Sequence, residues 1–262
     1  MSIVFAVRGD SVDARYSNAG KAPAILGTND PPEVTTDEPG INGSTSINMA
    51  GSFLTFRCLN YIGRENTPSG LARSMFCRVK FVSLASTQAL CFMGDHVRSP
   101  INFLGLNVTT TPEVNALVSN NATKTDAGTT TSSGIGTTNW HDIFVSWTGD
   151  TTSGGLKIYV DGVQKLSDTM TRSLASPYTD DERLICGNVG IGAHYSYKNT
   201  HYYLDEFVVW DSIVDPTSVA LTSGTGSLNG SSRTAYVDVS SYDGMALSGS
   251  STKTIRVGGI GY

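Results

Sequence analysis

Charged side chains are scarce in this sequence. They make up 16% of its 262 residues, against about 25% in an average soluble protein. The net charge is −5, and there is no long run of lysine or arginine. Because a phosphate backbone is bound chiefly through clustered positive charge, this composition argues against a nucleic-acid partner. Glycine is abundant instead, at 28 residues, and this composition favours strands and turns.

Long apolar segments are absent as well. No stretch reaches the roughly 18 consecutive apolar residues that a membrane-spanning helix needs. The opening MSIVFAVRGD has no basic region followed by a long apolar stretch, so it does not have the form of a secretory signal. We therefore expect a soluble chain that is made in a cytosol and is not inserted in a membrane.

Cysteine is the third scarce feature. The chain has four cysteines, which lie far apart and include no Cys-x-x-Cys pair. This spacing favours buried free thiols over disulfides or a zinc site. The four are Cys58, Cys77, Cys91 and Cys186.

Alternating apolar residues dominate the middle of the chain. In MFCRVKFV, residues 75–82, every second residue is apolar and Arg78 and Lys80 fall on the opposite face. This pattern predicts a half-buried antiparallel strand. In LKIYVDGVQKL, residues 156–166, a similar alternation runs into Asp161-Gly162. That pair predicts a two-residue β-hairpin turn, because both positions must tolerate positive φ.

Further strands are predicted on both sides of these segments, with connections rich in Ser, Thr, Gly and Asn such as residues 120–139. Strands spaced this regularly indicate a β-sandwich or jelly roll. The one helical signal is Asp215-Pro216, which predicts a single short helix or 3₁₀ turn. The other predicted strands begin at Ser2, Phe53, Ala89, Ile101, His141, Asn188 and Tyr202.

Composition changes towards both ends. From about Ser223 the chain is small and polar, and its two apolar islands, AYVDV and TIRVGGI, are predicted as edge strands or arms. Such a tail is more readily ordered by a partner than by a core of its own. We expect an N-terminal arm with the first strand over residues 1–42, a jelly roll over 43–222, and a C-terminal arm or small β extension over 223–262.

The order WHDIFVSWTG, LKIYVDG, NVGIGA and YYLDEFVVWD resembles the concanavalin A-like jelly rolls of the laminin-G and pentraxin kind. The resemblance covers roughly residues 43–215. It implies an all-β fold, a concanavalin A-like antiparallel β-sandwich (jelly roll) with extended N- and C-terminal arms, in which the matching residues mostly hold the fold together. These residues are Trp140, His141, Trp147, Tyr159, Val160, Asp161, Gly162, Gly190, Ile191, Gly192, Asp205, Glu206 and Trp210.

The polar arms resemble those of bacteriophage virion proteins of the head-decoration, fibre or tail-adhesin type. This resemblance implies a structural protein of a virion, made in the cytoplasm of a bacterial host.

Catalytic carboxylates are not evident. Glycoside hydrolases on this fold resemble one another in carrying a Glu-x-Asp-x-x-Glu strand, and this chain has no such triplet. Retaining hydrolysis needs two carboxyl groups about 5 Å apart. Asp205 and Glu206 are adjacent, so we expect their side chains on opposite faces of a strand, where they cannot form that pair by themselves. We predict no enzymatic activity and no catalytic residue.

Histidines and tyrosines cluster in GAHYSYKNTHYY, residues 192–203, which we expect to form a hairpin loop at one end of the sandwich. Aromatic rings on such a loop can stack on sugars, anchor a protein interface, or pack over the base of their own loop. His194 and His201 have no third ligand in sequence, so a metal site is not indicated. The candidate ligand- or partner-binding residues are His194, Tyr195, Tyr197, His201 and Tyr202, together with Asp95 and His96 at a strand end.

No cofactor is predicted, although calcium is a ligand that some members of this superfamily hold. Calcium needs six to eight oxygens that converge from several loops. The turn acids Asp150 and Asp161 and the acids at 180–182 are interpreted as solvated turns, and no metal ligand is assigned.

These features predict a non-enzymatic structural virion protein, either a capsid decoration protein or a fibre or tail component. Its arms would attach it to other virion proteins and to copies of itself, with a trimer as the expected oligomer. The alternative is an adhesin that binds host surface glycans through residues 192–203, with or without calcium.

Overall fold

The protein is described here from a computed structural model. The residues that it describes are 3–9, 16–17, 25–26, 32–40, 45–51, 53–57, 73–95, 102–121, 124–172, 183–187, 189–191, 195–197, 200–210, 212–214, 216, 221–228 and 231–237.

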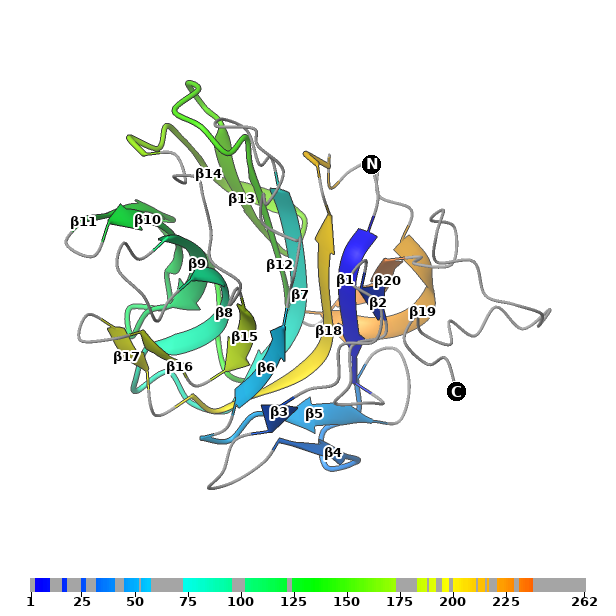
Figure 1. Ribbon diagram of the computed structural model, residues 1–262. Coiled ribbons are helices and arrows are strands. Elements are labelled where there is room, and N and C mark those ends of the chain that lie inside the picture. The colour runs from blue at the N-terminus through cyan, green and yellow to red at the C-terminus, as the bar shows by residue number, and fades with distance from the viewer. Residues whose placement is uncertain are drawn as a thin grey trace.

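Within these residues the strands form two large sheets and one small one (Figure 1). The central path of sheet A is β14-β13-β12-β7-β18-β1-β2, which β4, β5, β19 and β20 join at its sides. Sheet B runs β11-β10-β9-β8-β15-β6-β3, and β16 pairs only with β17. Sheet A contains β1 (Ile3–Arg8), β2 (Tyr16–Ser17), β4 (Glu33–Thr35), β5 (Ser46–Asn48), β7 (Arg73–Phe81), β12 (Trp140–Trp147), β13 (Leu156–Val160), β14 (Val163–Asp168), β18 (Tyr202–Trp210), β19 (Leu221–Leu228) and β20 (Ser231–Val237). Sheet B contains β3 (Ile25–Leu26), β6 (Phe53–Arg57), β8 (Gln88–Asp95), β9 (Asn102–Val108), β10 (Val114–Asn121), β11 (Lys124–Thr129) and β15 (Arg183–Gly187), and the small sheet contains β16 (Val189–Ile191) and β17 (Tyr195–Tyr197).

The two large sheets face each other across one apolar core (Figure 1). Met75, Cys77, Val79 and Phe81 on β7 all point into this core, so the alternation predicted for residues 75–82 is confirmed. The predicted all-β sandwich with antiparallel sheets is confirmed with it. Cys77 and Cys91 are buried free thiols, as expected; Cys58 and the side chain of Cys186 lie outside the described residues.

The hairpin turn predicted at Asp161-Gly162 connects β13 to β14. Both residues have positive φ, 52° for Asp161 and 78° for Gly162. These values fit the two-residue turn whose twist matches that of paired strands. The local sequence therefore determined this turn.

The outer face of β7 is largely buried too, which corrects the half-buried strand predicted there. Phe76 and Arg78 point away from the core, yet both side chains are buried. The strand register places Val208, Phe76, Phe144 and Tyr159 side by side across this outer face. Alternation in a sequence distinguishes the two faces of a strand, but it does not reveal whether another layer covers the outer one.

The first fifty residues extend sheet A at one edge and pack closely against β18. β1 pairs with β18, and the Gly9 N–H donates to the Asp205 carbonyl at 2.6 Å. Gly40 lies so close to the Asp205 carboxylate that a Cβ at Gly40 would be 2.0 Å from its Oδ1. Residues 1–42 thus contribute a strand and close packing to the sandwich, while the predicted division of the chain into three parts stays a prediction.

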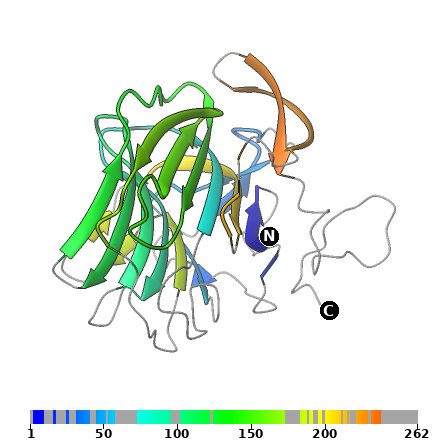
Figure 2. The ribbon, with the colours of Figure 1, turned by 90° about the horizontal axis from the view of Figure 1, so that it is seen from above.

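β19 and β20 form a hairpin in the predicted C-terminal arm. It meets the sandwich where Leu228 pairs in parallel with Trp140 at the start of β12. Figure 2 shows the hairpin projecting away from the two facing sheets. Residues 235–237 of the AYVDV island lie in β20, whereas TIRVGGI lies outside the described residues.

Four strands of sheet B lie where none was predicted: β3, β10, β11 and β15. β11 occupies part of the connection predicted at 120–139, because its pairing with β10 overrides a composition of small polar residues. In the predicted helical segment, Pro216 lies in a turn, and Asp215 and residues 217–220 are outside the described ranges. No helix in the described ranges is long and apolar enough to cross a membrane.

Candidate functional site

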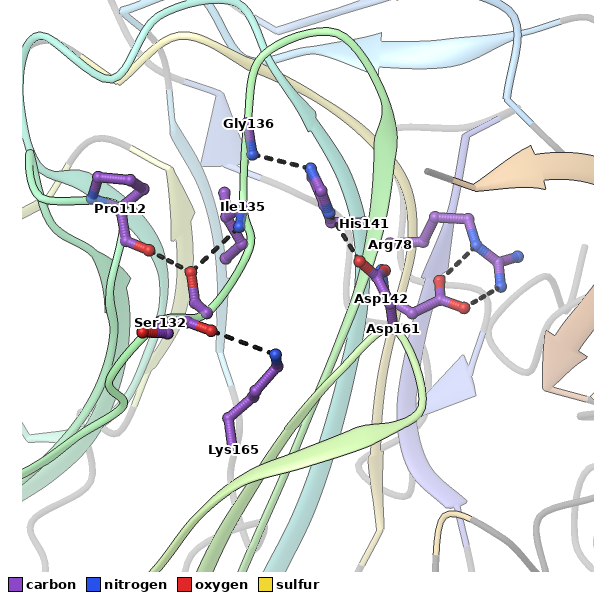
Figure 3. A network of polar contacts seen from close by, with 10 residues as sticks. Arg78, Pro112, Ser132, Ile135, Gly136, His141, Asp142, Asp161 and Lys165 are labelled. Atoms are coloured by element: carbon purple, nitrogen blue, oxygen red, sulfur yellow. Dashed lines mark hydrogen bonds and ion pairs between the residues drawn. The ribbon is translucent and has the colours of Figure 1, made fainter. Parts of the chain in front are cut away.

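His141 belongs to a polar network that fastens β12 to the β13–β14 turn (Figure 3). The Gly136 N–H donates to His141 Nε2 at 3.0 Å, so the ring proton is on Nδ1 and donates to Asp161 Oδ2 at 2.9 Å. The other carboxylate oxygen of Asp161 accepts the Asp142 N–H at 2.9 Å. Both ring nitrogens of this buried histidine have protein partners, which makes it a structural residue, as the family resemblance implies.

Arg78 is the centre of a second polar network on the outer face of sheet A. Its guanidinium donates to both carboxylate oxygens of Asp142, at 2.7 and 3.1 Å (Figure 3). Arg78 Nη1 also lies 3.9 Å from a carboxylate oxygen of Asp205 and of Glu206. All four side chains are buried.

The positions of Asp205 and Glu206 correct our prediction that they lie on opposite faces. The pairing of β18 with β7 shifts register between Leu204, opposite Val79, and Glu206, opposite Arg78. Asp205 is the extra residue of a β-bulge, which lets two consecutive side chains approach one partner. Adjacency in sequence therefore did not prevent the two carboxylates from meeting, and what they meet is an arginine.

The electrostatics of this network keep Arg78 charged. Burial by itself lowers the pKa of the guanidinium, but Asp142, and then Glu206 and Asp205, more than offset that effect, so the pKa is raised. The Phe76 ring lies 5.4 Å below the guanidinium carbon. Three of the buried carboxylates of the sandwich are thus committed to one structural cation.

The signature tryptophans are also structural. Trp147 and Trp210 are fully buried, and Trp140 is nearly so. Trp147 Nε1 donates to the Asp150 carbonyl at 3.1 Å, which closes the turn after β12. The Asp150 carboxylate accepts the Thr148 hydroxyl and the Thr152 N–H, and these hydrogen bonds lower its pKa.

The histidine- and tyrosine-rich segment is only partly described. Tyr195 and Tyr197 lie on β17, which pairs with β16 as a hairpin. Tyr202 instead starts β18 inside the core: its side chain is 0% exposed and its hydroxyl donates to the Leu90 carbonyl at 3.4 Å. Packing, one of the interpretations left open above, is thus what the structure shows for Tyr202, and its ring is not accessible to a ligand.

The remaining predicted site residues are less informative. His201 is half-buried, and its N–H donates to the Gln88 side chain at 2.6 Å. Asp95 ends β8, while His96 and His194 lie outside the described residues. Among the residues that the structure describes, no three His, Cys, Asp or Glu side chains lie close enough together to hold a metal ion.

A cavity of about 260 Å³ opens on the outer face of sheet A. Its floor is Ser146 on β12 with Lys157 and Tyr159 on β13. One wall is the turn that follows β12, and the other is the segment that follows β18. The lining residues are Ser146, Thr148, Thr152, Ser153, Gly154, Gly155, Lys157, Tyr159, Ile213, Val214 and Pro216.

Hydrogen bonds hold both walls in place. In the turn, the Thr148 N–H donates to the Gly155 carbonyl and the Gly155 N–H to the Thr152 carbonyl. Gly155 has no room for a side chain, because a Cβ there would be 2.3 Å from the Thr148 hydroxyl oxygen. In the other wall, buried Ser74 accepts the Val214 N–H at 2.8 Å and donates to the Ser212 carbonyl. The pocket is therefore preformed.

Sequence reasoning missed this pocket. Its residues come from β12, β13, a Thr/Gly turn and the segment after Trp210, and none of them has a marked sequence pattern. The available signal was the alternation of LKIYV, which places Lys157 and Tyr159 on the face opposite the core.

Comparison with known proteins identifies the fold. Residues 62–220 match a family model described as Laminin_G_3, of the concanavalin A-like lectin/glucanases superfamily. No curated protein matches the sequence.

Solved structures with this fold include botulinum neurotoxin type C, whose cell entry depends on interaction with two ganglioside molecules. It is 10% identical, with a TM-score of 0.58 over 82% of this chain and 49% of that chain, so this chain spans about half of its length. Domain 4 of AbnA, an extracellular arabinanase from Geobacillus stearothermophilus in complex with arabinotriose, is 14% identical, with a TM-score of 0.54 over 83% of this chain and 97% of that one.

At these identities the solved structures show a shared fold and nothing further. The family model, however, matches more than half of the chain in sequence. Its range includes the Trp-His strand, the Asp-Gly turn and the Asp-Glu strand described above. This protein belongs to the concanavalin A-like lectin/glucanases superfamily.

Proposed function

We propose that this chain is a non-enzymatic, glycan-binding module of a bacteriophage virion protein. The observation that carries the proposal is the pocket on the outer face of sheet A. It is preformed, its floor combines a hydroxyl, an ammonium and a phenol group, and Ile213 makes one wall apolar. Sugars combine hydroxyl groups with apolar C–H faces, and a site with a few placed polar groups beside apolar surface is suited to such ligands.

Proteins of the same fold support this proposal by analogy. The botulinum neurotoxin interacts with gangliosides and the arabinanase domain is a complex with arabinotriose. Both ligands carry sugars, although the fold alone does not transfer a ligand from one protein to another.

The non-enzymatic part of the proposal is supported by the engagement of the carboxylates. Asp142, Asp205 and Glu206 surround Arg78, and Asp161 holds His141. A glycosidase needs one carboxyl group to protonate the leaving group and a second to attack or to activate water. Carboxylates that are committed to a buried arginine or to a structural histidine are poorly placed for either role.

The direct test is a glycan array probed with the full chain, with calcium and with a chelator. Ser153→Trp would fill the pocket from its wall and should abolish binding. Thr151→Trp is the matched control, because Thr151 is exposed in the same turn but does not line the pocket. An array without any hit would refute glycan binding, and binding lost only in Tyr195→Ala or Tyr197→Ala would move the site to the predicted hairpin.

The second candidate function is structural: attachment of the protein within a virion through its terminal arms. The observation that favours it is the β19–β20 hairpin, which projects from the sandwich and pairs with β12 at a single position. Particles assembled with protein that lacks the residues after Ser223 should lose this component. Normal incorporation of the truncated protein would exclude the C-terminal arm as the attachment.

A further inference from the structure

The floor of the pocket contains Lys157, which has no ion-pair partner among the residues that the structure describes. The strand register places Ser74, Ser146, Lys157 and Ser167 in one row across β7, β12, β13 and β14. Side chains directly opposite each other in a sheet are nearest neighbours. Both cross-strand neighbours of Lys157 are therefore serines, whose small side chains leave space beside the long lysine.

The Lys157 ammonium is available to an outside anion. The side chain is exposed, and among the described residues none forms an ion pair or hydrogen bond with it. The acid in the adjoining turn, Asp150, is engaged by Thr148 and Thr152. Lys165 on the neighbouring strand β14, in contrast, has a partner in the protein: its ammonium donates to the Ser132 carbonyl at 3.2 Å.

Ser146 supplies a second polar group on the floor of the pocket. It is 3% exposed and lines the pocket, directly opposite Lys157 in the strand register. A ligand oxygen in the pocket would meet the Ser146 hydroxyl and the Lys157 ammonium together.

An apolar surface flanks these polar groups. Ile213 is 45% exposed at the pocket wall, because the bonds of Ser74 to its neighbours Ser212 and Val214 hold this segment against the sheet. The Tyr159 ring is fixed by its hydroxyl, which donates to Gln164, and by edge contact with Phe144. A sugar ring with one apolar face would lie against the side of the pocket that Ile213 and Tyr159 form.

We infer that the pocket binds a single carboxylate-bearing sugar, such as a uronic or sialic acid residue at the end or branch of a glycan. Lys157 binds the carboxylate, Ser146 binds a ring oxygen or hydroxyl, and Ile213 contacts the apolar face. The cavity of about 260 Å³ suits one sugar rather than several. The net charge of −5 disfavours a long polyanion, which the rest of the surface would repel. This inference rests on the proposed glycan-binding function and specifies its ligand.

The test is calorimetric titration of the full chain with matched acidic and neutral sugars: methyl glucuronide against methyl glucoside, and sialyllactose against lactose. The native chain should bind the acidic member of at least one pair about tenfold more tightly, the increment expected of one charge-assisted hydrogen bond. Lys157→Gln should remove that preference while leaving the neutral sugar unaffected. Ser146→Ala should weaken both.

Lys165→Gln is the control, because it removes a lysine from the adjacent strand and should change neither affinity. Lys157→Arg should retain the preference. The inference of an acidic ligand would be refuted if neutral and acidic sugars bound equally, or if the Lys157→Gln variant kept the preference. Either result would leave the proposed glycan binding intact. Failure of every sugar in both the titration and the array would overturn the proposed function as well.

Discussion

Arg78 is the residue on which most buried charge depends. It is fully buried with Asp142, Asp205 and Glu206 around it. Replacing it by methionine keeps much of the volume but leaves three carboxylates without their cation. We expect Arg78→Met to lower the free energy of unfolding by about 3–5 kcal/mol, measured by urea denaturation at neutral pH.

The matched control for this prediction is Lys80→Met. Lys80 is two residues further along the same face of β7 and pairs with Glu38 at 2.6 Å, but both side chains are partly exposed. Such a pair is worth less than about 1 kcal/mol. Equal losses in the two variants would show that burial of the Arg78 network does not determine its importance.

Asp150 gives a prediction about pH. Hydrogen bonds from Thr148 and Thr152 lower the pKa of its carboxyl in the folded protein. A carboxyl with a lowered folded-state pKa stabilises the fold above its unfolded pKa, near pH 4, and loses that contribution as the pH falls through the folded value. Asp150→Asn should therefore lower the melting temperature by a few degrees at most at pH 7, and the difference from the native chain should vanish in acid. A difference that persists at pH 2 would mean that the charge is not responsible.

At the scale of elements, the β13–β14 hairpin is where sequence and backbone geometry agree most closely. Gly162 has a φ of 78°, a conformation that costs residues with a Cβ about 1–2 kcal/mol. We expect Gly162→Ala to destabilise the protein by about that amount. Gly136→Ala is the control, because a Cβ there would meet no atom within 4 Å and its φ is not in the positive range; thermal unfolding of the two variants gives the comparison.

The bulge in β18 is an exception to the rule that neighbouring side chains on a strand point to opposite faces. Period-2 alternation predicts that Asp205 and Glu206 lie on opposite faces of the strand, and this placement was wrong. One extra residue in the pairing with β7 turned both side chains towards Arg78. A bulge depends on the partner strand, so no inspection of YYLDEFVVW alone could have placed it.

The whole molecule raises the question of the C-terminal hairpin. We expect the 262-residue chain to be an oligomer, with a trimer as the leading expectation, and the chain lacking the residues after Ser223 to be a monomer. Light scattering of the two samples gives both masses. If the truncated protein kept the same number of subunits, the arm would not be the assembly element. The surface of the sandwich would then have to form the contacts between subunits.

The sequence by itself determined the all-β class, the core face of β7, the Asp161-Gly162 turn and the family. Each of these depends on residues close together in the chain, whose alternation and backbone preferences are local properties. Sheet B was less predictable: β3, β10, β11 and β15 lack a clear alternating pattern in the sequence, and pairing with their neighbours defines them as strands.

Only the tertiary structure decided the burial of Arg78, the position of Tyr202 in the core and the existence of the pocket. All three depend on contacts between strands that are distant in sequence. Ser74, Ser146 and Lys157 are far apart along the chain, and the register of β7, β12 and β13 makes them neighbours. A local pattern specifies which side of a strand a residue occupies, whereas the partners across that side are set by how the sheets assemble.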